Sequence, residues 1–353
     1  MVNTNKKFSR EIISWFSENK RSLNFRKTKD PYKIWLSEVM LQQTQVKTVL
    51  PFYDKWTKKF PTLESVSLSN LDTLLKFWEG LGYYKRCINF YNASKIIVND
   101  FSGKIPCVKE RFLSLPGVGE YTASAVMSIA FNQPYPVLDG NVKRVISRVL
   151  GIKRLTIYNI KRINNFLESE ISLSKPGDFN QGLMEIGAII CKPIVPKCNK
   201  CPINEYCYAQ KKGFPEQFPI KTKSKPKPNY DVVVAIIWRQ NKFYIQKRGT
   251  NKMLGGLWEF PGGIVKKGED PESVLKQKVF TDCEVDLKIH KKVGSVEHAF
   301  SHFNIILTGY FCSERKYFIE EKENRKWISK KNIKDYPFPK ANHKLFKKLE
   351  LHN

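Results

Sequence analysis

Four cysteines lie close together in the second half of the sequence and could hold a metal. They are separated by six, two and five residues, and the other four cysteines of the chain are scattered. The grouped cysteines are Cys191, Cys198, Cys201 and Cys207. Nothing else in this segment explains such a density of thiols, and zinc and iron–sulfur clusters both accept four cysteine ligands. Spacing alone leaves both metals open, and the position directly after a helical segment favours a structural or docking role.

Two carboxylates have sequence surroundings that suit acid–base chemistry. On a helix, Glu38 shares an apolar face with Ile34 and Leu41. A carboxylate held there has a raised pKa, unless a different helix phase leaves it at the surface. Asp139 fits an N-cap, and its second possible role is an anion beside a developing cation. Cleavage of a glycosidic bond through an oxocarbenium-like state needs one such acid and one such anion.

A glycine-rich turn lies between these two carboxylates in the segment LPGVGEYTASAV, residues 115–126. Gly117 and Gly119 permit backbone angles that other residues resist, and the small residues that follow allow close helix packing. Bare amides in such a turn, next to a helix N-terminus, can hold a phosphate without reading any base. Taken alone, the pattern also fits a plain tight turn. A phenol, Tyr121, lies just past the two glycines.

The elements that must position these residues form two regions. Residues 8–209 have helical patterns throughout, including a helix start at Asp30 and Pro31 and a helix over 139–150. Residues 211–229 are rich in proline and lysine and predict an extended linker. From about residue 230 an alternating, β-branched pattern predicts a hairpin, with further strands around Val293 and over 304–311. We therefore expect a helical domain followed by an α+β domain.

The charge of the chain indicates a polyanionic partner. Its 353 residues carry 61 Lys and Arg against 33 Asp and Glu, a formal net charge of +28. Nucleic acid is the first candidate and an anionic membrane surface the second. The sequence contains no apolar run of membrane-spanning length, and its N-terminus does not resemble a signal peptide. We expect a cytoplasmic, nucleoid-associated protein whose cysteines stay reduced.

In combination, these motifs resemble a known enzyme family. The patterns LPGVGEYTA, VLDGNVKRV and the cysteine spacing resemble the helix–hairpin–helix DNA glycosylases that hold a [4Fe–4S] cluster. WLSEVMLQQTQV, GLGYYKR and NQGLMEIGAIIC are similar to the MutY-type adenine DNA glycosylases. This resemblance implies a [4Fe–4S] cofactor on the loop 191–207, a helical domain over 1–210 with its hairpin at about 113–126, a linker at 211–229, and a Nudix-like domain over 230–353.

The resemblance also implies roles for individual residues. Glu38 would protonate the flipped adenine at N7, Asp139 would stabilise the oxocarbenium sugar, and Asn141 and Tyr121 would be their neighbours. In a related branch the position of Tyr121 carries a lysine that attacks the sugar, which a phenol cannot do. A monofunctional enzyme that leaves an abasic site is therefore expected. The implied DNA-binding residues are Arg26, Gln43, Thr44, Tyr83, Gly117, Val118 and Gly119.

The second domain is similar to Nudix proteins but lacks most of the metal-binding carboxylates of that fold. GLWEFPGG and Glu269 match the start of a Nudix box, whereas 277–282 read QKVFTD where acidic residues would be needed. We expect no pyrophosphohydrolase activity. The resemblance implies instead that the segment HAFSHFN recognises 8-oxoguanine opposite the adenine. The residues implied for the lesion are Phe300, Ser301 and His302.

The expected partner is double-stranded DNA with adenine opposite 8-oxoguanine or guanine, bound by a monomer. Phe25 departs from the family, which usually has tryptophan before Arg26, so this chain keeps the aromatic face but has no indole donor at this position. Three alternatives remain open: a strand-cleaving enzyme for oxidised pyrimidines, a non-catalytic lesion-binding protein, and a nucleotide pyrophosphohydrolase. Tyr121 and the second domain disfavour the first, the two carboxylates disfavour the second, and the incomplete box disfavours the third.

Overall fold

The computed structural model describes residues 7–220, 226–316 and 318–350. Its contacts divide the chain into two compact units, Met1–Ser67 with Asn92–Lys223, and Leu68–Tyr91 with Ser224–Asn353. The segment Leu68–Tyr91 therefore belongs with the second unit, although the sequence places it inside the helical domain. Of the predicted linker 211–229, residues 221–225 lie outside the described part of the chain.

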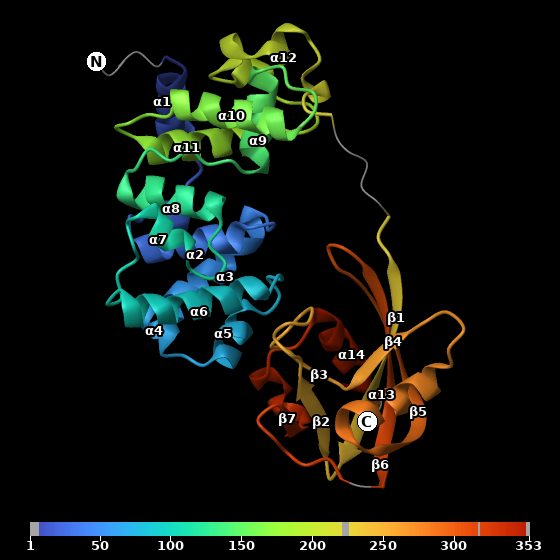
Figure 1. The fold of residues 1–353 in the computed structure, drawn as a ribbon. Coiled ribbons are helices and arrows are strands. Elements are labelled where there is room, and N and C mark those ends of the chain that lie inside the picture. Colours follow the sequence, from blue (N-terminus) through green and yellow to red (C-terminus); the bar gives the residue numbers. More distant parts are fainter. Residues whose placement is uncertain (1–6, 221–225, 317, 351–353) are drawn as a thin grey trace. The chain divides into compact units, whose positions relative to one another are not determined.

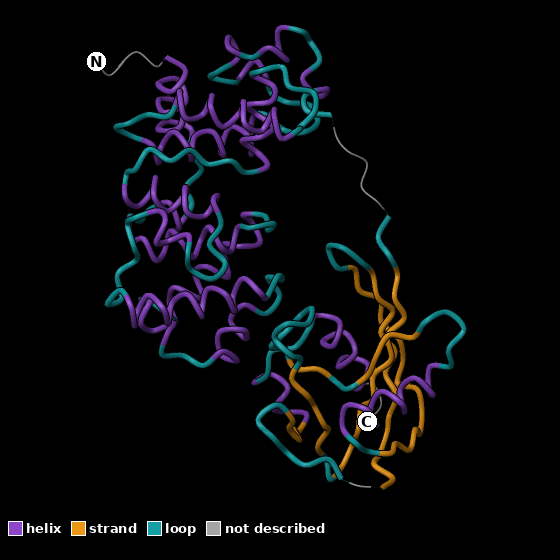
Figure 2. The backbone as a smooth tube through the Cα atoms, in the orientation of Figure 1, coloured by secondary structure: helices purple, strands orange, loops and turns teal. Residues whose placement is uncertain are grey.

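The helical region consists of short helices connected by turns (Figures 1 and 2). Its helices are α1 (Lys7–Asn19), α2 (Pro31–Leu41), α3 (Val46–Lys59), α4 (Leu63–Ser67), α5 (Leu71–Trp78), α6 (Lys85–Asp100), α7 (Lys109–Leu113), α8 (Glu120–Phe131), α9 (Gly140–Val149), α10 (Ile157–Glu170), α11 (Pro176–Glu185) and α12 (Tyr208–Lys211). A π-helical turn, η2 (Ile186–Ile190), continues α11, and short 3₁₀ turns lie at Asn24–Arg26, Cys198–Lys200, Asn204–Tyr206 and Pro215–Gln217.

Local capping explains where the helices that carry the predicted site begin. The side chain of Asp30 accepts from Tyr32 N at the start of α2, and Pro31 occupies its first turn. Asp139 caps α9 by accepting from Val142 N at 2.6 Å. Helix α8 begins directly after the glycine turn and buries a run of mostly small residues against α2 and α11. The first residues of α2, α8 and α9 are therefore specified by local sequence.

The strands and later helices belong to the second unit. They are β1 (Asn229–Arg239), β2 (Lys242–Lys247), β3 (Trp258–Glu259), β4 (Gly262–Val265), α13 (Pro271–Cys283), β5 (Asp286–Ala299), β6 (Asn304–Lys316), β7 (Arg325–Ser329), η6 (Lys330–Asp335) and α14 (Lys340–Glu350). The sheet order is β3-β2-β1-β6-β5, with β4 paired to β1 and β7 paired to β2. Only β1 and β6 pair in parallel among the described strands.

Alternation along β1 builds a core on each side of this mixed sheet. Val234 and Ile236 join one apolar cluster, to which α14 contributes Leu345. The intervening residues of β1 join a second cluster, to which α13 contributes Leu275 and Val279. The sheet therefore lies between α13 and α14, as the period-2 pattern of β1 requires. This confirms the predicted order of an all-α domain followed by an α+β domain.

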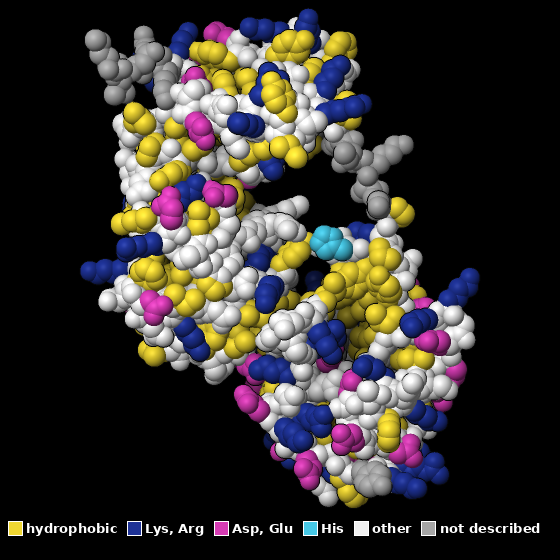
Figure 3. Space-filling model, in the orientation of Figure 1, with side chains coloured by type: hydrophobic (Ala, Val, Ile, Leu, Met, Phe, Trp, Pro, Cys, Tyr) yellow, Lys and Arg dark blue, Asp and Glu magenta, His cyan; other side chains and the backbone are white. Residues whose placement is uncertain are grey.

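The alternating patterns of the sequence predict β1, β2, β5 and β6 but not the other strands. β3 is two residues long and β4 begins with two glycines, so neither has a detectable alternation. β7 has five residues, of which Trp327 and Ile328 are buried. None of the helices in the described ranges has the length and apolar character needed to cross a membrane. Lys and Arg side chains are spread over the face of the molecule shown in Figure 3.

Candidate active site

Glu38 is buried in the helical unit with its carboxyl group facing a pocket. It lies near the end of α2 with only 6% of its surface exposed. Burial disfavours the charged form and raises the pKa of Glu38 to about 7, and the negative charge of Asp139 adds to this effect. A hydrogen bond from Tyr121 and the charge of Arg26 act in the opposite direction. Glu38 can therefore hold a proton near neutral pH, which is the property of a general acid.

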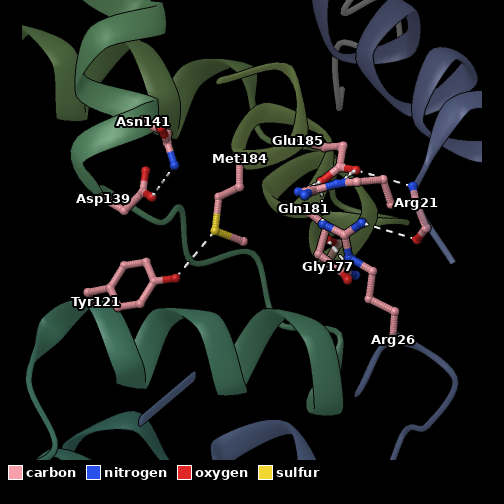
Figure 4. A network of polar contacts seen from close by, with 9 residues as sticks. All are labelled: Arg21, Arg26, Tyr121, Asp139, Asn141, Gly177, Gln181, Met184 and Glu185. Atoms are coloured by element: carbon pink, nitrogen blue, oxygen red, sulfur yellow. Dashed lines mark hydrogen bonds and ion pairs between the residues drawn. The ribbon is translucent and has the colours of Figure 1, made fainter. Parts of the chain in front are cut away.

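Tyr121 reaches Glu38 from the start of α8. Its hydroxyl donates to Glu38 Oε2 at 2.7 Å and also lies 3.3 Å from Met184 Sδ, a contact visible in Figure 4. Burial and the neighbouring carboxyl of Glu38 raise the pKa of Tyr121 well above its usual range. The phenol therefore stays neutral and acts as a hydrogen-bond donor to the carboxyl group.

Asp139, the N-cap of α9, and Asn141, in the first turn of this helix, also line the pocket. Besides capping the helix, Asp139 accepts from Asn141 Nδ2 at 3.2 Å (Figure 4). Burial raises the pKa of Asp139 above its usual range, while the donors from Val142 and Asn141 and the charge of Arg144 oppose this rise. Both roles considered for Asp139 are thus compatible with its position, because one oxygen caps the helix and the carboxyl still lines the pocket.

Arg144 and Gly187 hold Asn141 in place. Arg144 Nη2 donates to Asn141 Oδ1 at 2.9 Å and to Gly187 O at 2.7 Å, and Arg144 Nε donates to Cys191 O at 2.8 Å. A Cβ atom on Gly187 would lie 2.6 Å from the Asn141 Cβ, so a side chain at this position would displace Asn141. The first turn of α9 is thereby joined to the segment where the cysteines begin.

Two arginines and a buried glutamate form the other wall of the pocket (Figure 4). Arg21 binds Glu185 through Nε at 2.6 Å and Nη2 at 2.8 Å, and Arg26 Nη2 lies 2.7 Å from Glu185 Oε2. The Glu185 side chain is 1% exposed, and this burial favours a raised pKa. The hydrogen bonds from Arg21 and Arg26, with the charge of Arg26, outweigh burial and lower the pKa of Glu185 to about 2. Phe25 is buried beside Arg26 with its ring edge against Tyr53.

These residues enclose a cavity of about 170 Å³. It exceeds several times the roughly 30 Å³ that one water molecule occupies in the liquid, so it can accept a larger group. The predicted site residues that line it together are Arg26, Glu38, Thr44, Tyr121, Asp139 and Asn141. Gln43 follows α2 in a turn with a φ of 56° and does not line the cavity, and Tyr83, with a φ of 50°, belongs to the other unit.

The glycine turn has the predicted strained backbone at one of its two glycines. Gly117 has a φ of 78°, whereas Gly119 has an extended backbone and caps α8. Val118 has a buried side chain, and its amide donates to Leu115 O at 3.2 Å. Within the described part of the chain, the amides of Gly117 and Gly119 form no hydrogen bond. The groups of this turn that could hold a phosphate are thus those of the glycines and not that of Val118.

The four predicted metal ligands line a single small cavity of about 20 Å³ beside Arg148. Arg148 Nη1 lies 3.2 Å from Cys191 Sγ and 2.8 Å from Lys192 O. Burial raises the pKa of Cys201 to about 12. Across residues 7–220, 226–316 and 318–350, no three His, Cys, Asp or Glu side chains are close enough together to hold a metal ion. The chemistry of the donor set, four thiols that line one cavity, fits a soft metal centre, whereas the positions of these thiols do not form a coordination site.

In the second unit, the predicted lesion residues form the tip between β5 and β6. The Phe300 ring stacks on Phe303 at 4.7 Å and contacts the His298 ring at 4.5 Å, while Ser301 and His302 are exposed. The ring of His302 lies 6.4 Å from that of Tyr83, which belongs to the same unit. Aromatic rings at an exposed hairpin tip can stack on a nucleic-acid base.

The incomplete Nudix box lies on α13. Lys278 Nζ forms an ion pair with Asp282 Oδ1 at 2.9 Å, so a cation neutralises the acidic residue that remains in this segment. Glu269 accepts from Lys266 N in the preceding turn. The carboxylates of Asp282 and Glu269 are thus engaged within the chain, one by an ammonium group and one by a backbone amide.

Part of the pocket consists of residues that the sequence patterns do not predict. Arg21, Gln181, Met184 and Glu185 line it, but none of them was predicted as a site residue. Glu185 lies within NQGLMEIGAIIC, which was recognised only as a pattern. The signal for Glu185 is a charged residue among apolar neighbours. A glutamate that is buried with such neighbours needs a cationic partner, which marks it as part of a polar site.

Two known families match the chain in the order of its domains. Residues 36–167 match the HhH-GPD superfamily of base excision DNA repair proteins. Residues 232–348 match the NUDIX domain. The first match contains Glu38, Tyr121 and Asp139, and the second contains the loop at 300–303.

Curated relatives span almost the whole chain. Adenine DNA glycosylase of Buchnera aphidicola from Schizaphis graminum is 38% identical over 96% of this chain and 97% of its own length. The Rattus norvegicus enzyme of the same name is 30% identical over 86% of this chain and 70% of its own. Among solved structures, a thermostable thymine-DNA glycosylase has a TM-score of 0.54 and 33% identity, covering 59% of this chain and 96% of its own.

Proposed function

Because this chain belongs to the adenine DNA glycosylases of base excision repair, we propose that it hydrolyses the N-glycosidic bond of adenine mispaired with 8-oxoguanine or guanine. The product would be an abasic site in an otherwise intact strand. The observation that carries this proposal is the pocket in which a protonatable Glu38 faces Asp139 and a phenol. It would act as a monomer on double-stranded DNA of the nucleoid, with domains at 1–210 and 230–353 joined by a linker.

In this mechanism Glu38 gives its proton to N7 of an adenine that has left the helix. Base flipping is required because the glycosidic bond is inaccessible within the duplex. Protonation at N7 lets the bond between N9 and C1′ break with both electrons moving to the base, which leaves as a neutral molecule. The hydrogen bond from Tyr121 to Glu38 Oε2 orients the carboxyl group and stabilises its anionic form after the proton has left.

The sugar left behind is an oxocarbenium-like cation, and Asp139 would stabilise it. A buried carboxylate opposite a developing positive charge contributes most where water is excluded. Asn141 and the α9 amides hold Asp139 in its orientation. Water then adds at C1′ and loses a proton, so the overall reaction is hydrolysis. Tyr121 cannot form a Schiff base with C1′, which supports a monofunctional enzyme.

The remaining predicted residues have supporting roles in this proposal. Arg26 and Thr44 face the base within the pocket, while Gln43 and Tyr83 would wedge into the stack that the adenine leaves. Gly117 and Gly119 would bind a backbone phosphate through their amides, with Val118 shaping the turn. The loop with Phe300, Ser301 and His302 would read 8-oxoguanine.

We further propose a [4Fe–4S] cluster on Cys191, Cys198, Cys201 and Cys207, with Arg148 beside it. The cluster would keep the loop 191–207 folded against α9. The support is the common cavity of the four thiols and the membership of the family. When bound, the cluster supplies a rigid, covalently held anchor, and none of the bond-breaking steps above involves it.

The decisive experiment is single-turnover cleavage of a duplex with adenine opposite 8-oxoguanine, developed with and without alkali. We expect strand breakage at the adenine only after alkali, because an abasic site is the product. A duplex with thymine glycol serves as the control and should stay intact. Nicking of the thymine-glycol strand without alkali would contradict the proposal and indicate a lyase with an amine nucleophile.

Replacing Cys198 by Ser should remove the cluster. Loss of one thiolate from a four-cysteine site leaves an iron unsupported, so purified protein should lose most of its iron and acid-labile sulfide. The measurement is metal analysis of iron, sulfide and zinc beside the visible absorption spectrum. Cys107→Ser is the matched control, because Cys107 is an exposed cysteine outside the group. Stoichiometric zinc without sulfide in the wild-type protein would refute the iron–sulfur assignment.

A further inference from the structure

We propose that three lysines around the tip between β5 and β6 bind the phosphates of the DNA strand that carries the modified base. We call Lys227, Lys340 and Lys344 the lysine rim. The inference rests on the proposed function, because it adds a backbone contact to the loop that would read 8-oxoguanine. Contacts to a base give sequence specificity, whereas contacts to phosphates set the register and orientation of the protein on DNA. A loop that recognises a base therefore needs phosphate-binding residues beside it.

Lys227 lies on one side of the tip. Its ammonium donates to Phe300 O at 2.9 Å, and the Lys227 side chain is exposed. The residues that follow fix its place, since Asn304 N donates to Pro228 O at 2.9 Å and Asn304 Nδ2 donates to Asn229 Oδ1 at 2.8 Å. The start of β1 therefore holds this cation against the loop.

Lys340 and Lys344 lie on the other side, one turn apart on α14. Both are exposed, and Lys344 Nζ donates to Glu297 O at 2.6 Å, which joins the helix to β5. Their charges also act on His298: burial, followed by Lys344 and Lys340, lowers its pKa. The His298 ring lies 4.5 Å from that of Phe300. The hydrogen bond to Glu297 O places Lys344 beside the end of β5 that leads into the tip, and Lys340 lies one helical turn from Lys344.

The charges of the rim are available to an anion. Lys227 and Lys344 donate to backbone carbonyl oxygens, which orient an ammonium without neutralising it. Lysine binds phosphate as a point charge and needs no bidentate geometry. Ammonium groups beside a tip that carries the half-buried Phe300 and Phe303 and the exposed His302 suit a strand whose base stacks on the tip and whose phosphates run past it.

The test is the salt dependence of DNA binding by the full-length protein with Lys227, Lys340 and Lys344 all changed to Ala. Glu38→Gln is present in every sample so that the duplex stays intact. If each lysine neutralises one phosphate, the slope of log Kd against log salt should fall in magnitude by about 2.7. Between 50 and 200 mM salt, the affinity of the parent should then drop about 40-fold more than that of the rim variant.

A control variant removes the same charge elsewhere in the second unit: Lys288, Lys316 and Lys322, all exposed, are changed to Ala. Lys288 and Lys316 lie at the opposite end of the β5–β6 pair, where they face Ser313 and Asp286. The slope of this control should stay at the parent value. A rim variant with Arg at all three positions should retain the parent slope. This result would show that the effect of the Ala variant comes from the lost charge and not from a folding defect.

Equal slopes for the rim and control variants would overturn the inference. The comparison of slopes does not depend on which base the enzyme removes, because it measures DNA binding and not base excision. A wild-type protein that fails to release adenine opposite 8-oxoguanine would refute the proposed function and leave the slope comparison intact.

Discussion

Replacing Glu38 by Gln should lower the single-turnover rate of adenine release by about 10²–10⁴-fold, the usual contribution of a general acid. The amide keeps the shape of the side chain but has no proton to give to N7. In the wild-type enzyme, the rate should fall about tenfold per pH unit above about 7, because burial raises the pKa of Glu38 to about 7 and only the protonated form acts. The measurement is single-turnover base release between pH 5 and 9.

Two controls distinguish this interpretation from a folding defect. Tyr121→Phe removes a hydrogen bond that favours the Glu38 carboxylate, so the pKa should rise further and the decline in rate should move to higher pH. A rate of the wild-type enzyme that does not change between pH 6 and 9 would contradict the assignment of Glu38 as the acid.

The stability of the Glu38→Gln variant provides the second control. The folded-state pKa of Glu38 is raised from 4.5 to about 7, so its contribution to stability is present below pH 4.5 and is lost as pH rises through 7. At pH 8 the variant should therefore be more stable than the wild type, by up to about 3 kcal/mol. An inactive and more stable protein excludes misfolding as the cause of inactivity.

Replacing Glu185 by Ala should destabilise the helical unit by about 3 kcal/mol at pH 7, because it leaves two guanidinium groups at the pocket wall without their counter-ion. The pKa of Glu185 is lowered from 4.5 to about 2. Its contribution is thus present above pH 4.5 and is lost as pH falls through 2, which independently corresponds to about 3 kcal/mol. Urea unfolding of wild type and variant at several pH values measures the difference.

Glu168→Ala is the matched control, since Glu168 is an exposed glutamate of the same unit. Its effect should stay within about 0.5 kcal/mol. The difference between Glu185→Ala and wild type should shrink as the pH approaches 2. A difference of the same size at pH 7 and pH 2 would show that lost packing, and not the ion pairs, causes the destabilisation.

The sequence by itself determined the features that depend on neighbours along the chain. The cap at Asp139 is made by an amide three residues away, and the positive φ of Gly117 belongs to a single turn. The alternation of apolar residues along β1 specifies which side chains lie on each face of the sheet, and this does not depend on which strands pair with β1. The four cysteines are likewise recognisable because they lie within one short segment.

The tertiary structure alone decided the chemistry that depends on distant partners. Tyr121 meets Glu38 across 83 positions of sequence, and Glu185 meets Arg26 across 159. No periodic pattern encodes such a contact, because helix phase predicts which face a residue occupies but not what lies opposite. The raised pKa of Glu38 is a property of the assembled pocket. It requires desolvation by several helices at once, so it exists only when the unit is folded.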